Sequence, residues 1–240
     1  MNAQGGGELN RRFVSQVLFI DADDTLWENN IYFERAFDAF VEVLGHSSLS
    51  PAQVRASLDE IENVNNAVHG YGSSNFVRNL RQCLDHLAER GVTAEDLHRL
   101  ATIEFDLLNH PLDRIEGVEE TLVELRARHH LVLCTKGDAI EQSRKIESSG
   151  LARHFHEIEI VREKDEAQYR ALLTARRLNG GESWMIGNSP RSDILAPLAA
   201  GLGAVYVPHK HTWHLELEHL PESHARLHHV ASFTALLQHF

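Results

Sequence analysis

Short apolar runs punctuate this chain at intervals, and each is closed by polar residues. Runs of this length, bounded in this way, are typical of strands that are buried on both faces of a parallel sheet. The predicted strands are 17–20, 131–134, 158–161, 184–186 and 204–207. A further short strand is predicted near His229, and a final helix after it.

Amphipathic segments separate the last four of these runs. Apolar positions at helical spacing predict helices over 138–148, 166–178 and 191–200. Strict alternation of strand and helix indicates a parallel sheet with helices on both faces. The fold class predicted is therefore α/β, with a Rossmann-like core.

The stretch from 29 to 110 interrupts this rhythm, because it contains no convincing strand. Its apolar spacing is helical throughout, and Ser50-Pro51 and Thr93 have the form of helix starts. We therefore expect residues 29–110 to form an inserted helical cap, and residues 13–28 and 111–240 to form the α/β core. Residues 1–12 are Gly-rich and polar, and we interpret them as a flexible tail.

Composition restricts the kind of partner. The chain has 240 residues, a formal net charge of -12 and a pI of about 5.7. A surface this acidic argues against non-specific nucleic-acid binding and against an anionic membrane as partner. Two cysteines and no apolar run of signal or membrane-spanning length favour a reduced, cytoplasmic location. A small molecule remains the expected partner, and the sequence leaves open whether the chain is a monomer or a homodimer.

Chemistry-bearing residues follow the predicted strands directly. In open α/β sheets, ligands bind beyond the carboxyl ends of the strands, so these residues are expected to converge. They combine acids, cations, a hydroxyl and an amide, a set able to hold a divalent metal and a phosphoryl group together. The residues are Asp21, Asp23, Thr135, Lys136, Lys164, Asn188 and Asp193.

Four motifs in this order resemble those of the haloacid dehalogenase-like (HAD) hydrolase superfamily, in the branch with a helical cap after the first strand. The resemblance extends from Val17 to about Val207. It implies that Asp21, in Asp-Ala-Asp-Asp-Thr, attacks phosphorus and forms an aspartyl-phosphate. It implies that Asp23 protonates the leaving oxygen and later activates water.

The second and third motifs imply a phosphate cradle. Thr135 and the backbone of the turn at Gly137 would hold phosphate oxygens, and Lys164 would pair with both Asp21 and the phosphate. Lys136 is a further candidate for phosphate contact, although a solvent-facing side chain is the favoured interpretation. Lys145 is the rival to Lys164, but its mid-helix position predicts that it points outward.

The fourth motif, Gly187 to Asp193, departs from the family pattern at Asn188, where an acid is usual. An amide oxygen can still bind Mg²⁺, which takes hard oxygen ligands. The resemblance therefore implies a Mg²⁺ cofactor held by Asp21, Asp23, Asn188 and Asp193. A histidine-rich stretch, 209–214, lacks zinc-site spacing and is interpreted as surface or interface histidines.

The predicted reaction is Mg²⁺-dependent hydrolysis of a small organic phosphate monoester. Two alternatives stay open. A 2-haloacid dehalogenase is one, since Asn188 leans toward that pattern, whereas Asp23 does not. An inactive binding module that retains the fold is the other. Substrate choice is expected to come from the cap, with Tyr71 in the loop 68–75 as a substrate-binding residue.

Overall fold

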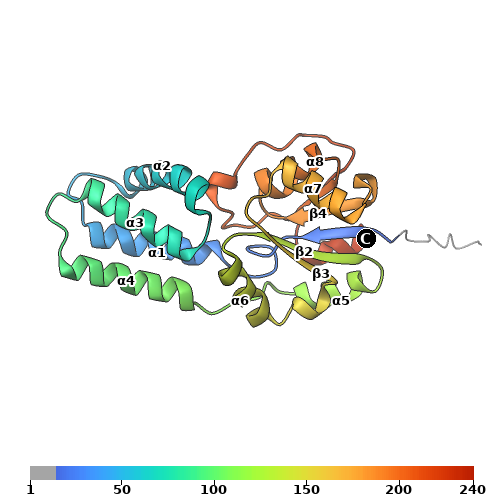
Figure 1. Ribbon diagram of the computed structural model, residues 1–240, viewed down its shortest axis with the longest axis horizontal. Coiled ribbons are helices and arrows are strands. Elements are labelled where there is room, and N and C mark those ends of the chain that lie inside the picture. The colour runs from blue at the N-terminus through green and yellow to red at the C-terminus, as the bar shows by residue number, and fades with distance from the viewer. Residues whose placement is uncertain (1–14) are drawn as a thin grey trace, which may run out of the picture.

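Six parallel strands form the core of the molecule. A computed structural model describes residues 15–240, and the segment interpreted as a tail, 1–12, lies outside the described residues. The strand order is β3-β2-β1-β4-β5-β6, with every pair parallel. This confirms the α/β prediction (Figure 1). The strands are β1 Val17–Ile20, β2 His130–Lys136, β3 Glu157–Val161, β4 Ser183–Gly187, β5 Gly203–Tyr206 and β6 Leu227–His229.

Alternate residues of each strand face opposite layers of helix, as the two-residue period of a strand requires. On β1, Leu18 and Ile20 join a cluster with α5 (Val118–Arg126) and α6 (Ala139–Ser149). Phe19 joins a second cluster on the other face with α7 (Glu166–Arg176). Because both faces are covered, the central strands are apolar at nearly every position.

Four helices with a hydrophobic cluster of their own lie beyond the carboxyl ends of the strands (Figure 1). Ser50 and Thr93 start two of them, and each forms a reciprocal capping box with the residue three positions on. The side chains of Phe40, Leu58 and Leu80 are fully buried between the helices. The helices are α1 Asn30–Leu44, α2 Pro51–His69, α3 Ser73–Leu87 and α4 Ala94–Asn109.

Two predicted helices take other forms. The segment 191–200 is a π-helix, η3 (Pro190–Leu195), followed by the short α8 (Ala196–Ala199). The last segment is a 3₁₀-helix, η5 (Phe233–Gln238). Three residues per turn place Phe233 and Leu236 on one face, and both are buried against the sheet. A single π turn is often found where a helix carries a functional side chain, as η3 does with Asp193.

The strand order reverses at β1. The chain passes from β1 to β2 and β3 on one side, and then crosses to β4 and β5 on the other. Where the strand order of an open α/β sheet reverses in this way, a crevice forms at the carboxyl ends of the strands. Here the four helices α1–α4 lie over that edge (Figure 1). Between residues 15 and 240, none of the helices has the length and apolar character needed to cross a bilayer.

Candidate functional site

The loop after β1 holds Asp21 in a fixed position. The amide of Asp21 donates to the carbonyl of Ile186 at 2.9 Å and so extends the pairing of β1 with β4. Asp24 follows in a left-handed conformation, with φ of 59°. Its carboxylate accepts from the amides of Asn29 and Asn30 at the start of α1. Burial raises the pKa of Asp24 to about 8. These contacts anchor the loop at both ends.

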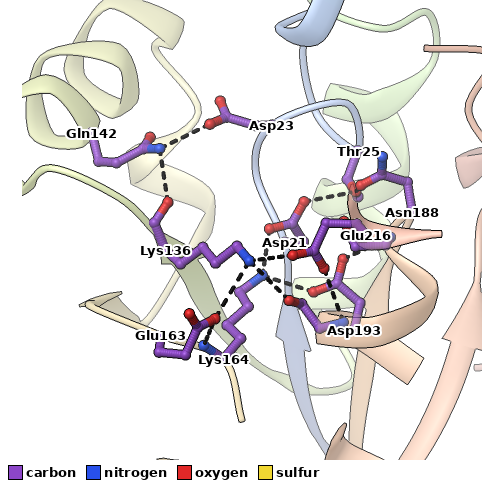
Figure 2. A network of polar contacts seen from close by, with 12 residues as sticks. Asp21, Asp23, Thr25, Lys136, Gln142, Glu163, Lys164, Asn188, Asp193 and Glu216 are labelled. Atoms are coloured by element: carbon purple, nitrogen blue, oxygen red, sulfur yellow. Dashed lines mark hydrogen bonds and ion pairs between the residues drawn. The ribbon is translucent and has the colours of Figure 1, made fainter. Parts of the chain in front are cut away.

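Lys164 bridges two buried carboxylates of the site, Asp21 and Asp193. Its Nζ lies 2.5 Å from Oδ1 of Asp21 and 2.8 Å from Oδ1 of Asp193 (Figure 2). Burial would lower the pKa of Lys164, but the charges of Asp193 and Asp21 outweigh it and the pKa is raised. Burial raises the pKa of Asp21 to about 7, against the attraction of Lys164. The predicted pairing of Lys164 with Asp21 is present.

Thr25 and Asn188 close the other side of Asp21. The Thr25 hydroxyl lies 3.0 Å from Oδ2 of Asp21 and 3.3 Å from Oδ1 of Asn188. The Asn188 amide nitrogen donates to the hydroxyl of Thr212 at 3.0 Å, which leaves its oxygen facing the Thr25 hydroxyl. Asp21, Asn188 and Asp193 therefore converge, as the order of their strands predicts.

Gly187 leaves the space that the Asp193 side chain occupies. A Cβ at Gly187 would lie 2.3 Å from Oδ2 of Asp193, so only glycine leaves room for the carboxylate. The same oxygen accepts from the amide of Ser189 at 3.0 Å, while the other oxygen accepts from Lys164. The π turn of η3 thus directs Asp193 inward toward the end of β1.

The side chain of Asp23 does not join this group, and its role as a metal ligand stays a prediction. Its carboxylate accepts from Lys145 at 2.6 and 2.7 Å, from Gln142 at 2.8 Å and from the indole of Trp27 at 2.7 Å. Burial would raise the pKa of Asp23, but the charge and hydrogen bond of Lys145 outweigh it and the pKa is lowered. Figure 2 shows Asp23 directed toward Gln142 of α6.

The expectation that Lys145 points outward was wrong. Its side chain is 8% exposed and also donates to Oδ1 of Asn29 at 3.0 Å. The helix α6 packs over the loop after β1, so the face carrying Gln142 and Lys145 turns inward. Helical periodicity had shown which residues share a face, but the docking of α6 decides which face is buried.

The end of β2 offers a free hydroxyl. Thr135 is 1% exposed and lines the cavity, and its hydroxyl has no hydrogen-bond partner among residues 15–240. Gly137 follows with φ of 148°, and a Cβ there would lie 2.8 Å from Nε2 of Gln142. The turn therefore needs glycine, and it brings Thr135 and its backbone to the cavity.

Lys136 lies in the cavity, so the solvent-facing interpretation was wrong. Its Nζ lies 2.5 Å from Oε1 of Glu216, 3.0 Å from the hydroxyl of Ser192 and 3.4 Å from Oε1 of Glu163. Glu216 belongs to the 3₁₀-helix η4 (His214–Glu216) in the long segment after β5, and nothing in its sequence context marked it. The ammonium of Lys136 is thus already paired with a carboxylate.

Tyr71 lies between α2 and α3, where the helices α1–α4 meet the sheet. Its hydroxyl donates to Oε2 of Glu163 at 2.6 Å, and its ring lies 4.4 Å from the ammonium of Lys136. Next to it, the amide and hydroxyl of Ser73 both donate to Glu141 at 2.8 Å. Tyr71 borders the cavity as expected, but these contacts also join the cap loop to the core.

One cavity connects the strand ends to the cap helices. Three of the four lysines in the chain line it, namely Lys136, Lys145 and Lys164. Helices α1, α2 and α3 supply its far wall, made of Phe33, Glu34, Arg55, Glu62, Asn66 and Phe76. A ligand bound at Asp21 would therefore extend toward the cap.

The residues around Asp21 fit a divalent cation. Two carboxylates and an amide oxygen are hard donors of the type that Mg²⁺ takes. The Asp21 and Asp193 carboxylates carry one negative charge more than Lys164 neutralises, and both side chains are almost fully buried. An added cation would offset that charge.

A second group of residues able to bind a metal ion lies beside the loop after β1. Asp24, Glu28 and His209 are close enough to share one ion. However, the His209 ring lies between the two carboxylates, with Nδ1 at 3.6 Å from Asp24 and Nε2 at 3.2 Å from Glu28. The two ring nitrogens face different partners, so the histidine bridges the acids. The composition of 209–214 had suggested exposed histidines. His209, however, lies between two carboxylates and is largely buried.

Comparisons with known proteins identify the family and the fold. The haloacid dehalogenase-like hydrolase family matches residues 16–201. A haloacid dehalogenase-like family hydrolase from Xanthomonas campestris has a similar structure, with a TM-score of 0.80, 31% identity and 92% of each chain covered. A phosphoserine phosphatase from Thermus thermophilus is 29% identical over 184 residues, 74% of this chain and 70% of its own. A 2-haloacid dehalogenase from Pseudomonas syringae shares the fold at 17% identity, with a TM-score of 0.61 over 94% of this chain and 97% of its own.

Proposed function

The chain belongs to the haloacid dehalogenase-like hydrolase family, and we propose that it is a Mg²⁺-dependent phosphohydrolase of small phosphate monoesters that works through an aspartyl-phosphate on Asp21. The observation that supports this most directly is the buried pair of Asp21 and Asp193, whose charge exceeds that of Lys164. A site built for a divalent cation and a phosphoryl group needs this excess. The phosphatase among the similar proteins points to the same substrate class.

In this proposal Asp21, Asn188 and Asp193 hold the metal, which when bound neutralises charge on the phosphoryl oxygens. The Thr135 hydroxyl, the backbone at Gly137 and the Lys164 ammonium bind the remaining phosphate oxygens. Lys136 lies beside them, although Glu216 holds its ammonium. All these groups are positioned before substrate arrives, which lowers the cost of reorganisation during reaction.

Asp21 attacks phosphorus with one carboxylate oxygen, and a new O–P bond forms while the ester O–P bond breaks. Asp23 first takes up a proton from solvent, because Lys145 favours its ionised form, and gives that proton to the leaving alkoxide oxygen; it later takes one from the water that hydrolyses the acyl phosphate. Its bonds to Lys145 and Gln142 keep the carboxylate out of the Asp21 group and on the cavity wall, toward the organic part of a substrate.

Dehalogenation of a 2-haloacid is the second candidate, and Asn188 is the observation that favours it, because an amide adds no charge to a metal site. The dehalogenase similarity is to the fold alone. Against it stands Asp23, since a halide leaving group needs no proton from a neighbouring acid.

A direct comparison of the two reactions tests the proposal. Purified protein is incubated with p-nitrophenyl phosphate, phosphoserine and alkyl phosphates, in Mg²⁺ and in EDTA, and phosphate release is measured. We expect turnover in Mg²⁺ and its loss in EDTA. Chloride release from 2-chloropropionate without metal would instead support the dehalogenase, and no turnover in either assay would support a binding module.

Removing the Lys145 ammonium should slow the reaction because it releases the Asp23 carboxylate from its position, although it also removes the charge that lowers the pKa of Asp23. We expect Lys145→Met to lower kcat for alkyl phosphates by about 10- to 100-fold, within the range of general acid–base catalysis. The loss should be smaller for p-nitrophenyl phosphate, whose leaving group needs little protonation. Lys145→Arg serves as the control that keeps the charge. Equal losses on both esters would show that Lys145 does not act through Asp23.

A further inference from the structure

The far wall of the cavity contains a buried carboxylate without a partner. Glu62, on α2, is 4% exposed and lines the same cavity as Asp21. Its Oε2 is buried without a hydrogen bond, and neither of its oxygens has a hydrogen-bond or ion-pair partner among the described residues. Carboxylates are seldom buried unless they are paired, because burial without a hydrogen bond is costly. Glu62 is therefore a candidate contact for a ligand.

The charges around Glu62 leave its own charge uncompensated. Arg55 lies two turns before it on α2, but its guanidinium pairs with Glu34 at 2.8 Å and lies 3.5 Å from the centre of the Phe37 ring. Asp59 adds another negative charge one turn away, and pairs with His214 at 2.8 Å. Among the residues of the far wall that line the cavity, the carboxylates of Glu34 and Glu62 outnumber the single guanidinium of Arg55 by one.

Other groups on this wall suit a small organic moiety. The rings of Phe33 and Phe76 meet edge to face with centroids 5.2 Å apart. Asn66 lies one turn beyond Glu62, and its oxygen accepts from Asn75 at 2.9 Å. A short apolar chain can pass along the rings toward Glu62, and a charged end group can stop there.

We propose that Glu62 binds a protonated amine at the far end of the substrate, so that the substrates are phosphate monoesters of amine-bearing alcohols. This rests on the proposed function, since the phosphate is placed at Asp21. An ammonium offers three hydrogen-bond donors and a full positive charge. It therefore supplies both the hydrogen bonds and the opposite charge that Glu62 lacks. A hydroxyl offers one donor and no charge.

Burial gives Glu62 a further property that agrees with this role. It raises the pKa of Glu62 to about 7, although Arg55 acts in the opposite direction. A bound ammonium stabilises the ionised form, so the amine and the carboxylate favour each other's charged state. An exposed glutamate would lack this selectivity for a charged ligand.

Matched pairs of esters test the proposal. The value of kcat/KM is measured in Mg²⁺ for 2-aminoethyl and 3-aminopropyl phosphate, and for the hydroxyalkyl phosphates of the same lengths. We expect at least one amine to exceed its partner by about 10- to 100-fold, the size of a charge-assisted hydrogen bond. Glu62→Gln keeps the shape and should bring that ratio close to one. Glu60→Gln, an exposed residue of the same helix, is the control and should keep the ratio.

A binding measurement separates this inference from the reaction itself. Calorimetry with 2-aminoethyl- and 3-aminopropylphosphonate, against ethyl- and propylphosphonate, reports the amine contact without turnover. Tighter binding of an amine, lost in Glu62→Gln with an unchanged melting temperature, would support the proposal. Hydrolysis of esters without preference for the amine, or a preference that survives Glu62→Gln, would overturn it. Hydrolysis of no ester at all would instead refute the proposed function.

Discussion

Asp21→Asn is expected to abolish phosphate release, with kcat reduced by about 10⁴-fold or more. An amide oxygen is a poor nucleophile and cannot form the acyl phosphate on which the proposed route depends. The substitution keeps the side-chain shape, so the bond from Thr25 and the neighbouring Lys164 can remain in place. Loss of activity would then report the chemistry and not the packing. Phosphate release with p-nitrophenyl phosphate, and circular dichroism for the fold, are the two measurements.

A trapping experiment makes this prediction specific. Wild-type protein quenched in acid after mixing with a labelled ester should contain covalently bound phosphate, and Asp21→Asn should contain none. Asp21→Ala is made in parallel, because deamidation of asparagine would restore the nucleophile slowly. Asp138→Asn is a control carboxylate at the cavity rim, where it caps α6. Activity above 1% in Asp21→Ala would show that another group or a water attacks the phosphorus.

The residues at the strand ends could be predicted because topology constrains them. Once the runs before Asp21, Thr135 and Asn188 are identified as parallel strands, their carboxyl ends must share one edge of the sheet. No knowledge of helix packing is needed for that step. Lys164 was placed correctly for the same reason, since it follows β3 closely.

Residues on helices and long connections could not be placed in this way. Lys145 was expected in solvent, because the sequence shows the period of α6 but not the direction in which it docks. Glu216 reaches Lys136 from the segment after β5, which has no periodic pattern. Glu62 follows apolar residues on an amphipathic helix, where a glutamate is ordinarily solvated. The direction of the Asp23 side chain depends on the hydrogen-bond donors of α6, Gln142 and Lys145, whose position the sequence does not show.

The structure also shows that Asp21 and Asp23, the two carboxylates of the loop after β1, lie in different environments. The family resemblance placed Asp21 and Asp23 together at one metal site. In the structure, Lys164 faces Asp21 and Lys145 faces Asp23, so each carboxylate has a cation of its own. The pKa of Asp21 is raised and that of Asp23 is lowered, and the two groups therefore differ in environment although only one residue separates them.

Lys164→Met is expected to cause the largest loss of stability among the site variants. The Lys164 side chain is 2% exposed and neutralises one of two buried carboxylates. Removing one partner of such a group leaves uncompensated buried charge, which costs about 3–5 kcal/mol. Methionine has a similar length, so packing changes little and the loss reports electrostatics. The free energy of unfolding is measured by urea denaturation at pH 8 in EDTA.

The chain supplies a matched control for this experiment in Lys210, which is the one lysine that does not line the cavity and which is exposed. Lys210→Met removes the same charge from the surface, where we expect a change within about 0.5 kcal/mol. Adding Mg²⁺ should return part of the stability of Lys164→Met, because a cation between Asp21 and Asp193 replaces the missing ammonium charge. Equal stabilities of the two variants would mean that the carboxylates are not both ionised in the folded protein. The excess of negative charge, on which the metal site is argued, would then be absent.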